Sequence, residues 1–258
     1  FGFIGPNGSG KSTTIRTLLS LLFPISGSAT VLGYDIIREA KHLKKEVGYL
    51  PSDVNFYDNM TIKELLKYSA DFYGVALDER NKTLVEKFEV NVNRNLQDLS
   101  TGNKKKVGII QALLHRPKLL ILDEPTNGLD PLMQSIFFEV LREENTSGTT
   151  IFYCSHILTE VQRLCKRVAV IRDGEIVATE TMGQLREKQL KHCQLILDGK
   201  VDPQQFEKPD ITDLEITPQG VSFNYSGDPA TLLRHLGQLA IKDITITEPS
   251  LEEVFMHY

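Results

Sequence analysis

The chain has 258 residues, of which 41% are hydrophobic and 24% charged, enough for one large domain or for a large and a small one with a sizeable core. Its formal net charge of −5 argues against a general nucleic-acid binder, which would normally be basic. No stretch approaches the ~18 apolar residues that cross a bilayer and no signal peptide is evident, so we expect a soluble, cytoplasmic chain whose membrane role, if any, runs through a partner.

Apolar runs of strand length alternate with helical patterns over the first part of the chain. Residues 1–4 form the first expected strand, and Lys11 to Leu22 carries isoleucine and leucine at helical spacing. Two stretches bounded by glycines, 27–36 and 47–51, are expected to be short strands. This alternation predicts an α/β fold with a mostly parallel sheet. Because the first strand starts with no lead-in, we expect that the sequence lacks its true N-terminus.

The middle of the chain continues this alternation. Thr61 to Tyr73 has the pattern of an amphipathic helix that Thr61 caps. The run LLILDEP, 119–125, predicts a buried strand that ends in two carboxylates, and TTIFYCSH, 149–156, predicts another strand that ends in polar residues. A hairpin is expected to turn at the Asp-Gly pair 173–174.

A smaller pattern follows a polar, charged segment near Met182 to Lys191. The order strand, short helix or loop, strand, strand, helix, strand fits a small ferredoxin-like α+β domain. A last helix is expected over 249–258, where Ser250 and Glu253 have the spacing of a capping box.

The three cysteines are Cys154, Cys165 and Cys193, and they form no CxxC pair and no metal-binding spacing with histidine. We therefore expect small buried residues in a reducing compartment rather than disulfides or a metal site.

A phosphate-binding loop is predicted at GPNGSGKS, 5–12, directly after a strand and before a helix. Its glycines allow main-chain N–H groups to turn toward a phosphate, and the start of the helix adds its positive end. Lys11 would reach the β- and γ-phosphates, Ser12 would ligate Mg²⁺, and Thr13 would touch the α-phosphate. The candidate phosphate-binding residues are Gly5, Pro6, Asn7, Gly8, Ser9, Gly10, Lys11, Ser12 and Thr13.

A pair of carboxylates completes this site. Asp123 and Glu124 follow the buried strand LLIL and should emerge at the carboxyl edge of the sheet, where α/β proteins bind ligands. Asp123 would hold Mg²⁺, and Glu124 would polarise the attacking water as a general base or a positioning group.

Phosphate loops also occur in kinases, GTPases and helicases, and further segments narrow the class. They are VGYLPS, then a helical insert, then LSTGN before a helix, DEPTNGLDP, and CSH. In this order they resemble the ATP-binding subunit of ABC transporters, over residues 1 to about 180. The tail EPSLEEVFMHY resembles the C-terminal extension of the drug- and polysaccharide-exporting members.

Two domains are expected. The resemblance identifies 1–190 as the ATP-binding domain with a helical subdomain at about 54–112, and the order of strands and helices predicts an accessory α+β domain at 191–258. The resemblance also implies ATP and Mg²⁺ as ligands. Residues 5–13 would form the Walker A loop, and His156 would hydrogen-bond the γ-phosphate. The remaining implied residues are the Walker B pair Asp123 and Glu124, signature residues Ser100 and Gly102 within 99–103, and Asp130 of the D-loop 127–130.

Three positions depart from the family pattern. Ser52 stands where a glutamine usually touches the Mg²⁺ shell, so it would act through water or Asp53 would take part. Thr101 and Asn103 replace a usual glycine and glutamine of the signature. The adenine-stacking aromatic has no candidate in this sequence. The basic run 104–106 is expected to be a solvated helix start, although a contact with the partner's phosphates stays open.

The resemblance implies a head-to-tail dimer, most simply of two copies, with each ATP held between Walker A of one subunit and the signature of the other. A transmembrane permease subunit would bind the pair at the inner face of the cell membrane. An exporter is expected from the tail. Two alternatives are a soluble ABC-type ATPase acting on ribosomes or DNA and a kinase with a phosphate loop.

The C-terminal domain is either regulatory, dimer-stabilising or a solvated appendage.

Overall fold

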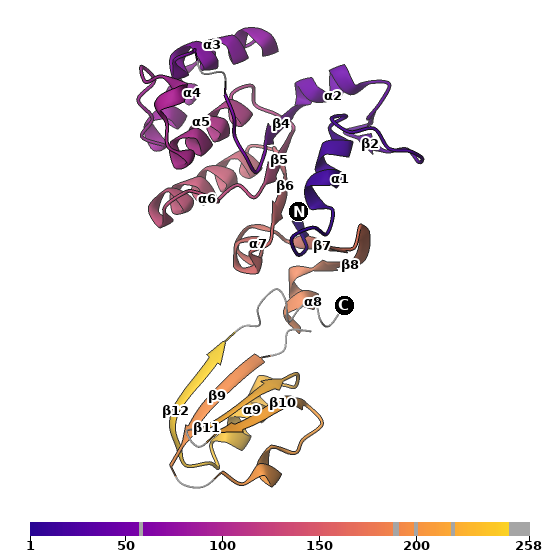
Figure 1. Cartoon of the computed structure of the whole chain (residues 1–258), viewed down its shortest axis with the longest axis vertical. Coiled ribbons are helices and arrows are strands. Elements are labelled where there is room, and N and C mark those ends of the chain that lie inside the picture. Colours follow the sequence, from indigo (N-terminus) through magenta and orange to yellow (C-terminus); the bar gives the residue numbers. More distant parts are fainter. Residues whose placement is uncertain (57–58, 188–190, 199–200, 218–219, 248–258) are drawn as a thin grey trace. The chain divides into compact units, whose positions relative to one another are not determined.

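The computed structural model describes residues 1–56, 59–187, 191–198, 201–217 and 220–247 (Figure 1). Contacts between Cα atoms divide the chain into two compact units, Phe1–Thr179 and Glu180–Tyr258. Among the described residues no helix is both long and apolar enough to cross a membrane.

A six-stranded sheet organises the first unit. Its first five strands in spatial order run parallel, which confirms the predicted α/β class. The spatial order is β4 (Val47–Leu50), β5 (Leu119–Asp123), β6 (Thr150–Ser155), β1 (Gly2–Ile4), β7 (Arg167–Arg172) and β8 (Glu175–Thr181). Because the strands are parallel, the segments that follow β1, β5 and β6 leave the sheet at one edge.

Helices cover both faces of this sheet. Figure 1 shows α1 (Lys11–Leu18) and α2 (Ala40–Glu46) on one side and α5 (Thr101–Leu113) and α6 (Pro131–Thr146) on the other. On the α1 side, Ile15 and Leu43 are fully buried against the sheet with Phe3 of β1. A short helix α7 (Leu158–Leu164) follows β6.

Two turns end their elements through left-handed residues. The helix expected over Lys11 to Leu22 ends at Leu18, because Ser20 has φ of 55° and an α-helix needs negative φ. The hairpin between β7 and β8 turns at Asp173 and Gly174, with φ of 51° and 83°. Positive φ at both central residues is the type I′ geometry that a two-residue hairpin favours, so this predicted turn is confirmed.

The glycine-bounded stretch 27–36 contains two short antiparallel strands, β2 (Thr30–Val31) and β3 (Tyr34–Asp35), in a sheet of their own.

The helical insert comprises α3 (Ile62–Tyr73), α4 (Glu79–Lys87), a 3₁₀ turn at Leu96–Asp98, and α5. Thr61 caps α3 as predicted, since its hydroxyl accepts from the Glu64 N–H and the Glu64 carboxylate accepts from the Thr61 N–H. Although Phe72 has the spacing of the apolar face, its side chain is 69% exposed.

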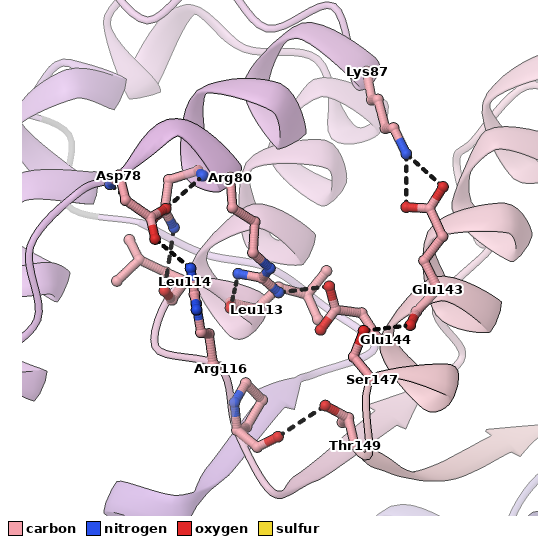
Figure 2. Close-up of polar contacts among 12 residues, drawn as sticks. Asp78, Arg80, Lys87, Leu113, Leu114, Arg116, Glu143, Glu144, Ser147 and Thr149 are labelled. Carbon is pink, nitrogen blue, oxygen red and sulfur yellow. Dashed lines mark hydrogen bonds and ion pairs between the residues drawn. The ribbon is translucent and has the colours of Figure 1, made fainter.

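A set of ion pairs fastens this insert to the core of the unit (Figure 2). The Arg80 guanidinium of α4 donates to Glu144 of α6 at 2.6 Å and to the Leu113 carbonyl at 3.0 Å. Lys87 of α4 pairs with Glu143 at 2.7 Å, nearer to solvent. Because α4 belongs to the insert and α6 packs on the sheet, these contacts fix one against the other.

The second unit includes the end of β8, then α8 (Met182–Glu187) and a four-stranded antiparallel sheet. The strand order β10-β11-β9-β12 is that of a ferredoxin-like fold, in which a 3₁₀ turn replaces the first helix. Its core joins the apolar sides of β9, β11 and α9. The expected last helix, 249–258, lies outside the described residues. The elements are β9 (Lys191–Leu197), the 3₁₀ turn (Pro203–Phe206), β10 (Ile211–Thr217), β11 (Gly220–Tyr225), α9 (Pro229–Leu236) and β12 (Ile241–Thr247).

All three cysteines are buried free thiols, as predicted. Burial, reinforced by the charges of Asp123 and Glu124, raises the pKa of the Cys154 thiol. Burial also raises the pKa of Cys193 to about 11, so both thiols stay protonated near neutral pH.

Candidate functional site

The loop between β1 and α1 has the shape of an anion-binding turn. Gly8 and Gly10 have φ of 81° and 101°, a conformation open mainly to glycine. At Gly5 an added Cβ would lie 2.5 Å from the Ile171 carbonyl oxygen, so no side chain fits there. Gly10 precedes α1 without a side-chain cap, which leaves the first N–H groups of the helix available to a ligand.

The other loop residues differ in exposure. Ser9 is buried, and its hydroxyl has no hydrogen-bond partner among the described residues. Pro6, Asn7 and Thr13 are exposed, and Ser12 is half-buried at the start of α1. The loop therefore presents its main chain and the Ser12 and Thr13 positions together at the beginning of one helix.

Lys11 lies under this loop. Its ammonium donates to the Gly5 carbonyl at 2.7 Å and to the Pro6 carbonyl at 3.1 Å, and its side chain is only 7% exposed. It also lies 3.8 Å from Glu124 Oε1. Folding thus holds a positive charge between the glycine loop and the end of β5.

Asp123 ends β5 with a fully buried side chain. Neither of its carboxylate oxygens has a hydrogen-bond partner within the described part of the chain. A buried carboxylate without partners is costly unless a cation neutralises it. Mg²⁺ binds proteins through one or two carboxylates and takes its other ligands from water and phosphates, so Asp123 and Ser12 fit that ion.

Glu124 is held in a strained conformation next to Asp123. Its φ of 48° is rare for a residue with a side chain. Its N–H donates to the Cys154 carbonyl at 2.9 Å, which anchors it to β6. Its Oε2 lies 2.8 Å from His156 Nδ1. The structure therefore brings the carboxylate of Glu124 between Lys11 and His156, three residues that the sequence pattern had singled out.

A buried carboxylate that sequence reasoning missed supports this arrangement. Glu160 of α7 is 8% exposed. Its Oε1 accepts from Thr126 at 2.7 Å, and its Oε2 accepts from Tyr153 at 2.9 Å and from Ser155 at 3.0 Å. Burial and the nearby Glu160 charge raise the pKa of Tyr153, so that hydroxyl stays a donor. Glu160 thus ties the segment after Glu124 to the strand before His156.

The residues expected to form the signature, Ser100 and Gly102, lie at the start of α5. Ser100 caps the helix, with its hydroxyl accepting from the Asn103 N–H at 3.4 Å. Gly102 packs so closely on the D-loop that a Cβ would lie 2.5 Å from the Gly128 carbonyl oxygen. Asp130 caps α6 through the Met133 N–H at 3.0 Å. Among the described residues no hydrogen bond joins Ser100 or Gly102 to the loop 5–13 of the same chain.

The loop that carries Ser52 is held from α5. Lys105 is 2% exposed and donates to the Ser52 carbonyl at 2.7 Å. The prediction that 104–106 form a solvated helix start is therefore wrong for Lys105, whose side chain turns inward along the buried face of α5. Asp53, the alternative to Ser52, is exposed.

Comparison with known proteins places this site in a family. The model of the family "ABC transporter" matches residues 1–127. A bacitracin transport ATP-binding protein of Bacillus licheniformis is 33% identical over 99% of this chain and 87% of its own length. A Nod factor export ATP-binding protein I of Rhizobium etli is also 33% identical, over 99% of this chain and 83% of its own length.

Similarity to a solved structure agrees with these relatives. An ATP-binding subunit of an ABC transporter superposes with a TM-score of 0.67 at 31% identity, covering 72% of this chain and 79% of that one. With the phosphate loop, the two carboxylates and His156 gathered at one sheet edge, and with relatives matched along nearly its whole length, the chain belongs to the ABC transporter family as an ATP-binding subunit.

Proposed function

We propose that this ATP-binding subunit hydrolyses ATP at the edge formed by β1, β5 and β6, with Glu124 polarising the attacking water. One observation carries the proposal: the Glu124 carboxylate lies 3.8 Å from the Lys11 ammonium and 2.8 Å from the His156 ring. A carboxylate held between a phosphate-binding cation and an imidazole is placed to orient water toward a γ-phosphate.

The neighbouring residues divide the other roles. Lys11 and the main-chain N–H groups of the loop 5–13 would bind the β- and γ-phosphates. Ser12 and Asp123 would hold Mg²⁺, which supplies charge neutralisation between the β- and γ-phosphates. Ser52 would contribute to that shell through water. His156, whose side chain is 43% exposed, would hydrogen-bond the γ-phosphate rather than act as the base.

We infer that the complete site needs a second copy of the chain. Ser100 and Gly102 begin α5 and contact their own D-loop, and they make no bond to their own phosphate loop among the described residues. At a helix N-terminus, the Ser100 hydroxyl and the Gly102 N–H are suited to a γ-phosphate bound by a partner. ATP would then close a head-to-tail dimer, and hydrolysis would release it.

A transmembrane permease is the proposed partner of the dimer, at the inner face of the cell membrane. The ends of α1 and α3 border a hollow of about 300 Å³ that includes Tyr49 and Gln111. Leu21 and Phe72 on its rim are 51% and 69% exposed, and exposed apolar side chains gathered around a hollow are typical of a protein interface. Because one relative is named for export and another for transport, we propose an exporter rather than a ribosome- or DNA-acting ATPase.

The replacement Glu124→Gln tests the proposed chemistry. We expect ATP hydrolysis to fall at least about 100-fold, the scale of losing one transition-state group, while ATP binding persists and an ATP-bound dimer accumulates. The measurements are phosphate release and size-exclusion chromatography with saturating ATP and Mg²⁺. Glu139→Gln, an exposed glutamate on α6, is the matched control. A Glu124→Gln chain that hydrolyses ATP at the normal rate, or stays monomeric with ATP bound, would contradict the proposal.

A further inference from the structure

Lys105 is a buried lysine whose ammonium donates to three main-chain carbonyls. Its Nζ donates to the carbonyls of Ser52 at 2.7 Å, Glu124 at 3.2 Å and Pro51 at 3.3 Å. Among the described residues it makes no ion pair within 4.0 Å with a carboxylate. Desolvation lowers its pKa, although the negative charges of Asp53, Asp123 and Glu124 act in the opposite direction.

The three acceptors come from two segments that are far apart in the sequence. Pro51 and Ser52 directly follow β4 and start the connection to α3, whereas Glu124 directly follows β5. Lys105 itself belongs to the second turn of α5, just beyond Ser100. One ammonium therefore joins the start of the helical insert, the signature helix and the end of the Walker B strand.

The number of bonds explains why a lysine is needed here. An ammonium has three N–H donors and no acceptor, and here it meets three carbonyl oxygens. An apolar side chain of the same length would leave the Pro51 and Ser52 carbonyls without this donor, and losing buried hydrogen bonds is costly. The Glu124 carbonyl would keep only the longer bond from the Asn127 N–H at 3.4 Å. Because the acceptor on Ser52 is its main-chain oxygen, the contact does not require any particular side chain at that position.

The bond to Glu124 acts where the main chain is strained. Glu124 has φ of 48°, a conformation that persists only when its surroundings hold it. The Cys154 carbonyl accepts from its N–H on one side, and Lys105 donates to its C=O on the other. Together these two bonds fix the peptide planes that flank Glu124, and they thereby set the direction of its carboxylate toward Lys11 and His156.

We infer that Lys105 is a positioning residue for ATP hydrolysis, which ties Glu124 to the loop that leads into the helical insert. The inference rests on the proposed role of Glu124. In this chain the link between the loop 51–52 and the hydrolytic carboxylate runs through main-chain carbonyls and the Lys105 ammonium. Tyr49 of β4 lines the proposed permease hollow. If permease binding moved the loop that follows β4, the Lys105 side chain would transmit that movement to Glu124.

The experiment compares Lys105→Met with Lys105→Arg in the full chain. Methionine keeps the stem that packs in α5 and removes every donor, whereas arginine keeps a charge and several donors. Lys41→Met, an exposed lysine of α2, is the control for loss of a charge. For each chain kcat and KM for ATP are measured, together with amide hydrogen exchange in the segments 52–54 and 124–127.

We expect Lys105→Met to lower kcat at least tenfold with KM within threefold of the unaltered chain. Exchange in both segments should rise at least fivefold, and Lys105→Arg should recover more than half of kcat.

The inference is overturned if Lys105→Met leaves kcat within twofold or if exchange in either segment is unchanged. Should Lys105→Met fail to melt cooperatively, Lys105→Gln replaces it under the same criteria. If the unaltered chain had no ATPase activity, the proposed function would be refuted. The role of Lys105 in holding the two segments would still be tested, because hydrogen exchange in the variant chains does not depend on ATP hydrolysis.

Discussion

The two units differ most in the polar groups that they bury. The first unit encloses two lysines and several carboxylates, among them Lys11, Lys105 and Asp123, close to the carboxyl edge of its sheet. In the described part of the second unit, Asn224, which is 9% exposed, is the single buried amide or charged side chain. Its core otherwise consists of aliphatic and aromatic side chains and Cys193.

Burying charge is expensive, and a buried ion pair is often no more stabilising than an apolar replacement of similar volume. The first unit accepts this cost where Lys11, Glu124 and His156 meet and where Lys105 and Glu160 hold the main chain around them. The second unit folds on apolar burial with hardly any such cost. We therefore infer that the buried charges at the carboxyl edge of the sheet mark where the chemistry occurs, whereas the Arg80–Glu144 pair serves stability. Three sets of variants test that inference.

The largest effect is expected from Glu160→Ala. This change leaves the hydroxyls of Tyr153, Ser155 and Thr126 without their common acceptor, so unfolding free energy should fall by about 2–4 kcal/mol. Because the same bonds hold the segments next to Glu124 and His156, kcat should also fall by about tenfold or more. Thermal unfolding and phosphate release measure the two effects.

Glu139→Ala, on the exposed side of α6, is the control for loss of a glutamate. If Glu160→Ala lowered stability but left kcat unchanged, the buried charge at this position would serve folding alone. The difference between the units would then not mark the site of chemistry.

Glu160 also shows where prediction from sequence stops. The phosphate loop and the two carboxylates could be predicted because their spacing and their position beside strands and helices are local properties. Glu160 has no such local signal, since its three donors come from β6 and from the turn after β5, which only the fold brings together. Lys105 was misjudged for the same reason: its neighbours in the sequence are lysines, and its partners lie in two other segments.

The fold itself was predictable to a similar extent. Alternating patterns gave the parallel sheet and the ferredoxin-like order, because both follow from periodicity along the chain. The end of α1 at Leu18 could not be predicted, because the apolar pattern continues to Leu22 although the left-handed Ser20 ends the helix.

An intermediate effect is expected at the contact between α4 and α6 that Figure 2 shows. Arg80→Met breaks a pair whose side chains are 24% and 11% exposed, and it leaves Glu144 with a mostly buried charge. The unfolding free energy should fall by about 2–3 kcal/mol, less than the about 3–5 kcal/mol for a fully buried pair, because Arg80 is partly exposed. Thermal unfolding and phosphate release again give the two measurements, and kcat should stay within about twofold.

Lys87→Met provides the matched comparison, because Lys87 and Glu143 are 35% and 59% exposed. An exposed pair contributes about 0–1 kcal/mol, so this change should be nearly silent. Equal losses from both variants would show that burial does not set the strength of these pairs. A large fall in kcat from Arg80→Met would instead show that the contact between α4 and α6 also affects ATP hydrolysis.

The smallest effect is expected in the second unit, from Asn224→Ala. Asn224 Nδ2 donates to Asp213 at 2.9 Å, and its Oδ1 lies 2.9 Å from His192 Nδ1 across the β9–β11 pair. Because both partners are near solvent and can bind water instead, the stability of this unit should fall by only about 1 kcal/mol. Amide hydrogen exchange in β9 and β11 measures that change, and Thr245→Ala, at an exposed position of β12, is the control. ATP hydrolysis and the monomer–dimer balance should stay unchanged if the unit is an appendage. A shifted monomer–dimer balance with unchanged kcat would show that the second unit stabilises the dimer. A fall in kcat comparable to that of Glu160→Ala would show that the second unit contributes to ATP hydrolysis, which would contradict the proposed difference between the two units.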